Sequence, residues 1–135
     1  MLNLRAIVSG LMMAGLVAWT ALAQEKPTHS KDTVQDVKSN VEAGKAVIVD
    51  VREKVEWDDG HVKGAIHLPK SQLDDKAKLA DLVKKLDKSK IIYTHCKAGG
   101  RALACGELLK KEGYDVRPLK PGYQQLIEGG LEKAK

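Results

Sequence analysis

The chain of 135 residues contains no phenylalanine, and Trp, Tyr and Phe together make up only 4% of it. This scarcity argues against a nucleic-acid platform, in which bases stack on aromatic side chains set among cationic ones. The formal net charge of +5 is mild, and the lysines are spread among Asp and Glu along the chain. We therefore expect no nucleic-acid partner and a charged, solubilising surface, which still allows a positive field at one site.

Several common binding motifs are also missing. No G-x-G-x-x-G occurs, and Ala43-Gly44-Lys45-Ala46 lacks the upstream glycine and the following Ser or Thr of a phosphate-binding loop. The residues His67, His95, Cys96 and Cys105 do not have the spacing of zinc ligands. The sequence therefore predicts neither a metal nor a cofactor.

The beginning of the chain differs in composition from the rest. Arg5 precedes an almost unbroken apolar run from Ala6 to Leu22, and Ala21-Leu22-Ala23 fits the A-x-A cleavage pattern. These features predict a secretory signal peptide over residues 1–23. The alternative is an uncleaved membrane anchor, since the run approaches the roughly 18 to 20 residues that span a bilayer.

The remainder of the chain is of a length that suits one compact domain. Residues 24–31 are polar, contain Pro27, and predict a flexible leader, so we assign the domain to residues 32–135. We expect an exported protein in a bacterial periplasm or a similar compartment, with no stable membrane insertion after cleavage. The alternative location is a membrane, if the signal is retained.

Apolar patterning predicts helices that alternate with short strands rich in β-branched residues, and hence an α/β fold with helices around a parallel sheet. The expected strands cover residues 46–51, 65–68, 91–94 and 115–119. The expected helices run from a cap at Asp32 or Thr33 to Gly44, then over 71–86 with Ser71 as cap, 101–112 and 123–128.

The two cysteines lie nine residues apart, with Cys105 on the expected helix 101–112. Their Cα atoms would then exceed the roughly 7 Å limit for a disulfide. We therefore expect Cys105 to be a small core residue and Cys96 to be a free thiol.

Cys96 lies between an expected strand and an expected helix, where ligands gather in parallel sheets. The positive end of the helix and the cations Lys97 and Arg101 favour the thiolate. Gly99 and Gly100 allow the backbone amides to curl inward around an anion. The stretch predicts a nucleophilic sulfur in an anion cradle; the alternative is a plain Gly-Gly turn beside a buried packing cysteine.

Two motifs, far apart in the sequence, resemble those of single-domain rhodaneses, which are sulfurtransferases. The first comprises Asp50-Val51-Arg52-Glu53, Glu56-Trp57, Gly60-His61-Val62-Lys63-Gly64-Ala65 and Leu68-Pro69, and the second is Cys96-Lys97-Ala98-Gly99-Gly100-Arg101. The resemblance covers about residues 34–130. It implies a rhodanese-like three-layer α/β/α sandwich with a central parallel sheet.

The resemblance also implies a mechanism in which Cys96 takes sulfur from a small anionic donor such as thiosulfate and passes the persulfide sulfur to cyanide or a thiol. The inward amides of Ala98 to Arg101 would stabilise the persulfide, while Lys97 and Arg101 would hold the donor. Arg101 could equally serve the structure by pairing with a carboxylate such as Glu53.

Three further positions of the first motif lie near the implied site. We expect Asp50 and Arg52 to pair and fix the architecture, with catalysis as the less favoured role. We expect His61 to be an interior histidine bonded to backbone, the alternative being a proton shuttle. His95 could add positive charge, but it should point to the opposite face of its strand from Cys96.

The spacing C-x4-R favours sulfur transfer over a phosphatase or arsenate reductase, because related phosphatases of this fold have C-x5-R. The alternative function is a sulfur carrier or persulfide-binding module that works with a protein partner and does not turn over. Leu119-Lys120-Pro121-Gly122 replaces the family's usual Leu-x-Gly-Gly turn, which leaves substrate preference open. We expect a monomer.

Overall fold

The computed structural model describes residues 25–135, so the signal peptide expected over residues 1–23 lies outside it. Between residues 25 and 135, no helix is both long enough and apolar enough to cross a bilayer.

Four parallel strands form one sheet in the order β2-β1-β3-β4. They are β1 (Ala46–Asp50), β2 (Ile66–His67), β3 (Ile91–His95) and β4 (Asp115–Val116). The register sets Asp50, at the end of β1, opposite His67 on one neighbouring strand and His95 on the other. The carboxyl ends of three strands therefore meet at one edge, and Cys96 follows directly after β3.

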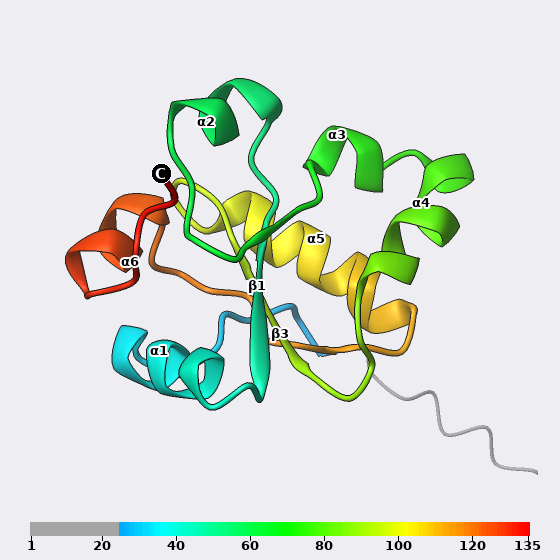
Figure 1. Cartoon of the computed structure of the whole chain (residues 1–135). Coiled ribbons are helices and arrows are strands. Elements are labelled where there is room, and N and C mark those ends of the chain that lie inside the picture. Colours follow the sequence, from blue (N-terminus) through cyan, green and yellow to red (C-terminus); the bar gives the residue numbers. More distant parts are fainter. Residues whose placement is uncertain (1–24) are drawn as a thin grey trace, which may run out of the picture.

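Helices cover both faces of this sheet. In Figure 1, α1 (Val34–Glu42) and α6 (Tyr123–Glu128) lie on one side, and α3 (Lys70–Leu73), α4 (Lys76–Leu82) and α5 (Gly100–Lys111) lie on the other. The short helix α2 (Lys54–Asp59) follows β1 at the carboxyl edge of the sheet. The expected three-layer α/β/α sandwich with a central parallel sheet is confirmed.

The central strands are buried on both faces, because helices cover both. Since successive side chains of a strand point to opposite sides, each strand contributes to two apolar clusters. Ile48 and Tyr93 pack with Val37 of α1 and Leu126 of α6 in one cluster. The other cluster, on the side of α5, is made of these buried residues: Val49, Val51, Leu68, Leu73, Val83, Leu86, Ile92, Cys96, Ala102, Cys105, Leu109, Tyr114 and Val116. The apolar runs that predicted strands therefore supply the core of both layers.

The expected helix 71–86 is wrong as one element, because the chain breaks it into α3, α4 and a 3₁₀ turn, η1 (Val83–Lys85). Asp75 accepts a hydrogen bond from the Ala77 amide and so caps a new helix. Ser71 is not the cap of α3, which begins after Pro69; instead, Ser71 binds the Glu53 carboxylate.

Two other elements differ from the expectation by more than one residue at an end. Helix α2 was not expected, because it is short and polar; the Glu56 side chain accepts a hydrogen bond from the Glu53 amide at its start. Strand β4 is shorter than 115–119, although the amides of Arg117 and Leu119 still donate to β3. Pro118 between them has no N–H to donate.

Cys105 lies on α5 and is fully buried, which confirms it as a core residue. Burial raises the pKa of its thiol to about 12. Both Cys96 and Cys105 are free thiols. At neutral pH, Cys105 is therefore a neutral packing group.

Gly106→Ala tests how closely α5 packs on the segment after β4. A Cβ at Gly106 would lie 2.5 Å from Cγ of Pro118. Alanine gains about 1 kcal/mol in helix propensity, but overpacking costs about 1–3 kcal/mol, so we expect a net loss of about 1 kcal/mol in the free energy of unfolding. Urea denaturation measures it, with exposed Lys111→Ala on the same helix as control; a stabilised Gly106→Ala would contradict the close packing.

Candidate functional site: the Cys96 loop

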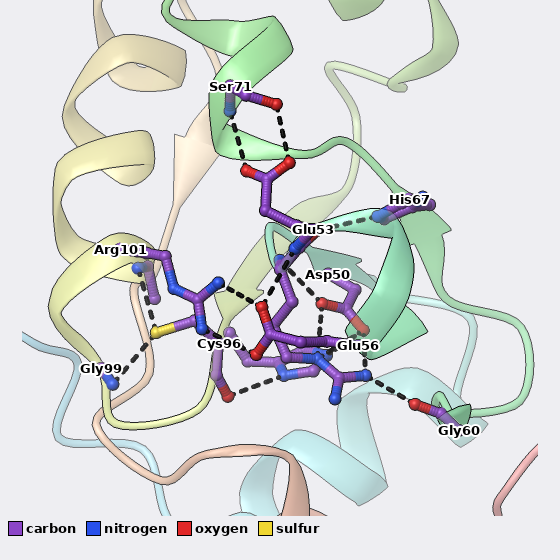
Figure 2. A network of polar contacts seen from close by, with 12 residues as sticks. Asp50, Glu53, Glu56, Gly60, His67, Ser71, Cys96, Gly99 and Arg101 are labelled. Carbon is purple, nitrogen blue, oxygen red and sulfur yellow. Dashed lines mark hydrogen bonds and ion pairs between the residues drawn. The ribbon is translucent and has the colours of Figure 1, made fainter. Parts of the chain in front are cut away.

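The Cys96 loop, residues 96–101, joins β3 to α5 and wraps its backbone around the sulfur. Sγ of Cys96 accepts hydrogen bonds from the amides of Gly99 at 3.1 Å and Ala102 at 3.4 Å (Figure 2). Gly99 has a φ of +95°, in the left-handed region that favours glycine. The loop therefore forms the inward-facing backbone that the sequence predicts.

The amides that donate to the sulfur differ in part from those expected to do so, which were the amides of Ala98 to Arg101. Gly99 belongs to that set, whereas Ala102 lies one residue beyond it. Helix α5 begins at Gly100, so Ala102 is in its first turn, where amides have no partner within the helix. The sulfur thus accepts from the helix start, where the backbone dipole also favours negative charge.

Cys96 is only 1% exposed. Lys97, directly after it, is exposed and lines two hollows beside the loop. One, of about 290 Å³, is bordered by Arg52, Glu56, Asp59, Gly60, Lys97, Tyr123 and Gln124. The other is a more open cleft bordered by Val34, Lys97, Ala98, Lys120, Pro121, Gly122 and Gln125. The Lys97 ammonium is therefore the exposed cation nearest in sequence to the sulfur.

The turn before α6 packs directly on the Cys96 loop. A Cβ at Gly122 would lie 1.8 Å from the carbonyl oxygen of Lys97, and the Tyr123 amide donates to the Cys96 carbonyl at 2.9 Å. Only glycine allows this approach. The turn Leu119-Lys120-Pro121-Gly122 therefore retains the second glycine of the usual pattern, while proline occupies the place of the first.

Arg101 pairs with Glu56, and not with Glu53 as the sequence suggested. Its Nη1 and Nη2 lie 2.5 and 2.9 Å from the two oxygens of the Glu56 carboxylate (Figure 2). These hydrogen bonds lower the pKa of Glu56 to about 2 and raise that of Arg101. Glu53 binds Ser71 instead. The pairing ties the first turn of α5 to α2, which supports the structural role of Arg101.

Asp50 and Arg52 form the buried ion pair that the sequence predicts. Arg52 Nη2 lies 2.7 Å from Asp50 Oδ2 and also donates to the Gly60 carbonyl at 2.7 Å. The guanidinium carbon lies 4.3 Å from the centre of the Tyr123 ring. Arg52 thus contacts the end of β1, the end of α2 and the start of α6.

Neither His95 nor His61 forms a hydrogen bond with the sulfur, whose donors are the Gly99 and Ala102 amides. His95 Nε2 is 3.5 Å from Asp50 Oδ2, and burial lowers the pKa of His95, so the ring is neutral at pH 7 and adds no positive charge. His61 Nδ1 lies 3.0 Å from the Trp57 carbonyl oxygen. The His61 and His67 rings both stack on Trp57, with ring centres 3.5 and 4.6 Å away. His61 thus has the backbone bond expected of it.

Across residues 25–135, no three His, Cys, Asp or Glu side chains gather in a way that could hold a metal ion.

Glu56→Gln tests the ion pair that holds the first turn of α5. Because the pKa of Glu56 falls from 4.5 to about 2 on folding, its charge stabilises the fold fully above pH 4.5 and loses this effect as the pH falls towards 2. Allowing for solvent screening, we expect Glu56→Gln to lower the free energy of unfolding at pH 7 by about 1 kcal/mol. Urea denaturation at pH 7, 4 and 2.5 should show this difference disappearing with acid.

Glu132→Gln is the matched control, because Glu132 forms an exposed ion pair with Lys63. We expect little change in this variant at any pH. If the loss of unfolding free energy in Glu56→Gln stays constant down to pH 2.5, its cause is packing and not the charge of Glu56.

The similarity of this chain to known proteins covers the whole domain and not the Cys96 loop alone. Residues 33–128 match the family described as the rhodanese-like domain. The probable adenylyltransferase/sulfurtransferase MoeZ of Mycobacterium tuberculosis is 34% identical over 101 residues, which are 74% of this chain and 24% of that protein. The putative sulfur carrier protein YrkF of Bacillus subtilis is 26% identical over 83 residues, 61% of this chain and 42% of YrkF. The chain thus spans about a quarter of the first relative and less than half of the second.

Among solved structures, the crystal structure of a rhodanese-related protein from Thermoplasma volcanium is similar over 79% of this chain and 98% of that one. Its TM-score is 0.64, at 27% sequence identity. The matched residues 33–128 run from the cap of α1 to the last residue of α6 and so contain the whole sheet and the Cys96 loop. The chain therefore belongs to the rhodanese-like domain family.

Proposed function

We propose that this protein is a sulfurtransferase that moves a sulfane sulfur through a persulfide on Cys96. The observation that carries the proposal is the pair of amides, from Gly99 and Ala102, that donate to Sγ at the start of α5. This arrangement favours negative charge on sulfur, as persulfide chemistry requires. Family membership and relatives named as a sulfurtransferase and a sulfur carrier support sulfur transfer in general.

The first half-reaction transfers sulfur from a donor such as thiosulfate to the enzyme. The Cys96 thiolate attacks the outer sulfur of the donor, a new S–S bond forms, and the donor's own S–S bond breaks. Sulfite leaves with the electron pair of that bond, and a Cys96 persulfide anion remains. The negative charge thus moves outward from Sγ by one atom.

The second half-reaction returns the enzyme to its starting state. A thiophilic acceptor such as cyanide attacks the terminal sulfur, a carbon–sulfur bond forms, and the S–S bond to Cys96 breaks. The electron pair returns to Sγ as thiolate, and thiocyanate leaves. The Gly99 and Ala102 amides stabilise the thiolate as a leaving group in this step just as they stabilise it as a nucleophile in the first.

The two cations of the loop have different roles in this proposal. Arg101 has both terminal nitrogens engaged by Glu56, so it holds the loop and contributes only a screened charge to the donor. Lys97 is exposed and faces the hollows beside the loop. Lys97 is therefore the cation that attracts the anionic donor. The C-x4-R spacing supports sulfur over phosphate as the transferred group.

The second candidate function is a sulfur carrier that accepts sulfur once and delivers it to a protein partner. The observation that favours this candidate is the relative named as a putative sulfur carrier, which is 26% identical to this chain over 83 residues. Turnover separates the two functions, since a carrier takes up one sulfur and stops.

Intact mass measured before and after thiosulfate is the first test of persulfide formation. We expect wild type to gain about one sulfur atom, roughly 32 Da, and to release thiocyanate repeatedly when cyanide is added. Cys96→Ser should show neither. Cys105→Ser is the matched control and should retain uptake and turnover, because Cys105 is a buried packing group. Uptake without turnover would favour the carrier, and no uptake would contradict persulfide chemistry.

Lys97→Gln tests the attraction of the anionic donor. We expect KM for thiosulfate to rise about threefold to fivefold, the size expected of one exposed charge, with kcat within about twofold. Added salt should reduce the difference, because exposed charges are screened. Lys88→Gln is the control, because Lys88 lies before the amino-terminal end of β3, whereas Cys96 follows the carboxyl end of that strand. An equal rise of KM in the two variants would show that net charge causes it, and would contradict a role of Lys97 in attracting the donor.

A further inference from the structure

His29 lies against the Cys96 loop, although it belongs to the leader expected over residues 24–31. Its Nε2 is 2.9 Å from the carbonyl oxygen of Gly99. Because a carbonyl oxygen only accepts hydrogen bonds, Nε2 carries a proton and donates it. The same oxygen accepts from the Leu103 amide at 3.1 Å, within the first turn of α5. The Gly99 carbonyl is thus held by two donors.

Residues 29–32, which we call the N-terminal strap, have neither helical nor strand structure but are fixed at two further points. The Ser30 amide donates to the Pro118 carbonyl at 2.7 Å. The Asp32 carboxylate accepts from the Tyr93 hydroxyl at 2.5 Å and from Arg117 Nη1 at 2.9 Å. The strap is therefore anchored to β3 and to the segment after β4, and these anchors hold His29 in place.

The contact acts at the most adaptable point of the loop. Gly99 and Gly100 adjoin, and glycine has more backbone freedom than any other residue. The Gly99 carbonyl, which His29 holds, and the Gly99 amide, which donates to Cys96 Sγ, belong to peptide groups that meet at one Cα. Fixing the first group restricts rotation at Gly99 and so limits how far the amide can swing away from the sulfur.

The space around Gly99 is consistent with a close, specific contact. A Cβ at this position would lie 3.0 Å from His29 Nε2 and 3.1 Å from the Lys120 carbonyl oxygen. The imidazole and the turn before α6 thus both border the side of Gly99 on which a Cβ would lie. A side chain at residue 99 would therefore crowd both the strap and this turn.

We propose that His29 is a positioning residue for the Cys96 loop: through the Gly99 carbonyl, it keeps the Gly99 amide directed at the Cys96 sulfur. The kinetic consequence rests on the sulfur transfer proposed above. The geometric consequence, the order of the Gly99 amide, does not depend on that function.

The kinetic test follows persulfide formation by intact mass in a single turnover at increasing thiosulfate, with wild type, His29→Ala, His29→Gln and Thr28→Ala. We expect His29→Ala to lower the limiting rate about fivefold, the effect of one ordinary hydrogen bond, with the half-saturating thiosulfate concentration within about twofold. His29→Gln should retain the rate within about twofold, because its side-chain amide nitrogen can replace Nε2 as donor. Thr28 is exposed, so Thr28→Ala should match wild type.

A second measurement is hydrogen exchange of the Gly99 amide by NMR, which needs no donor. Exchange should accelerate in His29→Ala and not in His29→Gln, with melting temperatures confirming that each variant is folded. An unchanged or faster limiting rate in His29→Ala, or His29→Gln as slow as His29→Ala, would overturn the inference. If wild type forms no persulfide, the proposed function fails, while Gly99 exchange still decides the role of His29.

Discussion

The amides of Gly99 and Ala102 both point at the Cys96 sulfur, and this requires α5 to begin within a few residues of the end of β3. A later start would leave the Ala102 amide outside the helix turn that faces the sulfur. Thr94 of β3 reinforces the short connection, because its hydroxyl donates to the Ala102 carbonyl at 2.9 Å. The chemistry of the site thus depends on the spacing between one strand and one helix.

That spacing is maintained by polar contacts from elements far away in sequence. Glu56 of α2 holds the side chain of Arg101, and Gly122 lets the turn before α6 press on the loop. The buried ion pair between Asp50 and Arg52 links these elements to the end of β1. Loss of either partner would leave an uncompensated buried charge. The loop therefore has flexible glycines within it and a rigid frame around it.

The sequence predicted the parts of the structure that depend on burial and failed where placement depends on contacts between distant segments. Strands β1 and β3 follow from apolar β-branched runs, because both of their faces are buried. Cys105 followed from the apolar pattern of its helix. By contrast, Glu56 is 45 residues from Arg101 along the chain, and no local pattern distinguishes it from Glu53 as a partner. Helix α2 carries no apolar periodicity, and the new cap at Asp75 was hidden by an apolar pattern that continues across it.

The Trp57 stack has an optical consequence. Trp57 is the one tryptophan among residues 25–135, it adjoins the Glu56 that holds Arg101, and its ring lies against the rings of His61 and His67. Indole emission responds to contact with imidazole and to its protonation. A movement of α2 away from the Cys96 loop would change these contacts together with the ion pair. The protein thus carries an intrinsic fluorophore directly after the residue that holds Arg101, placed to report on α2 without an added label.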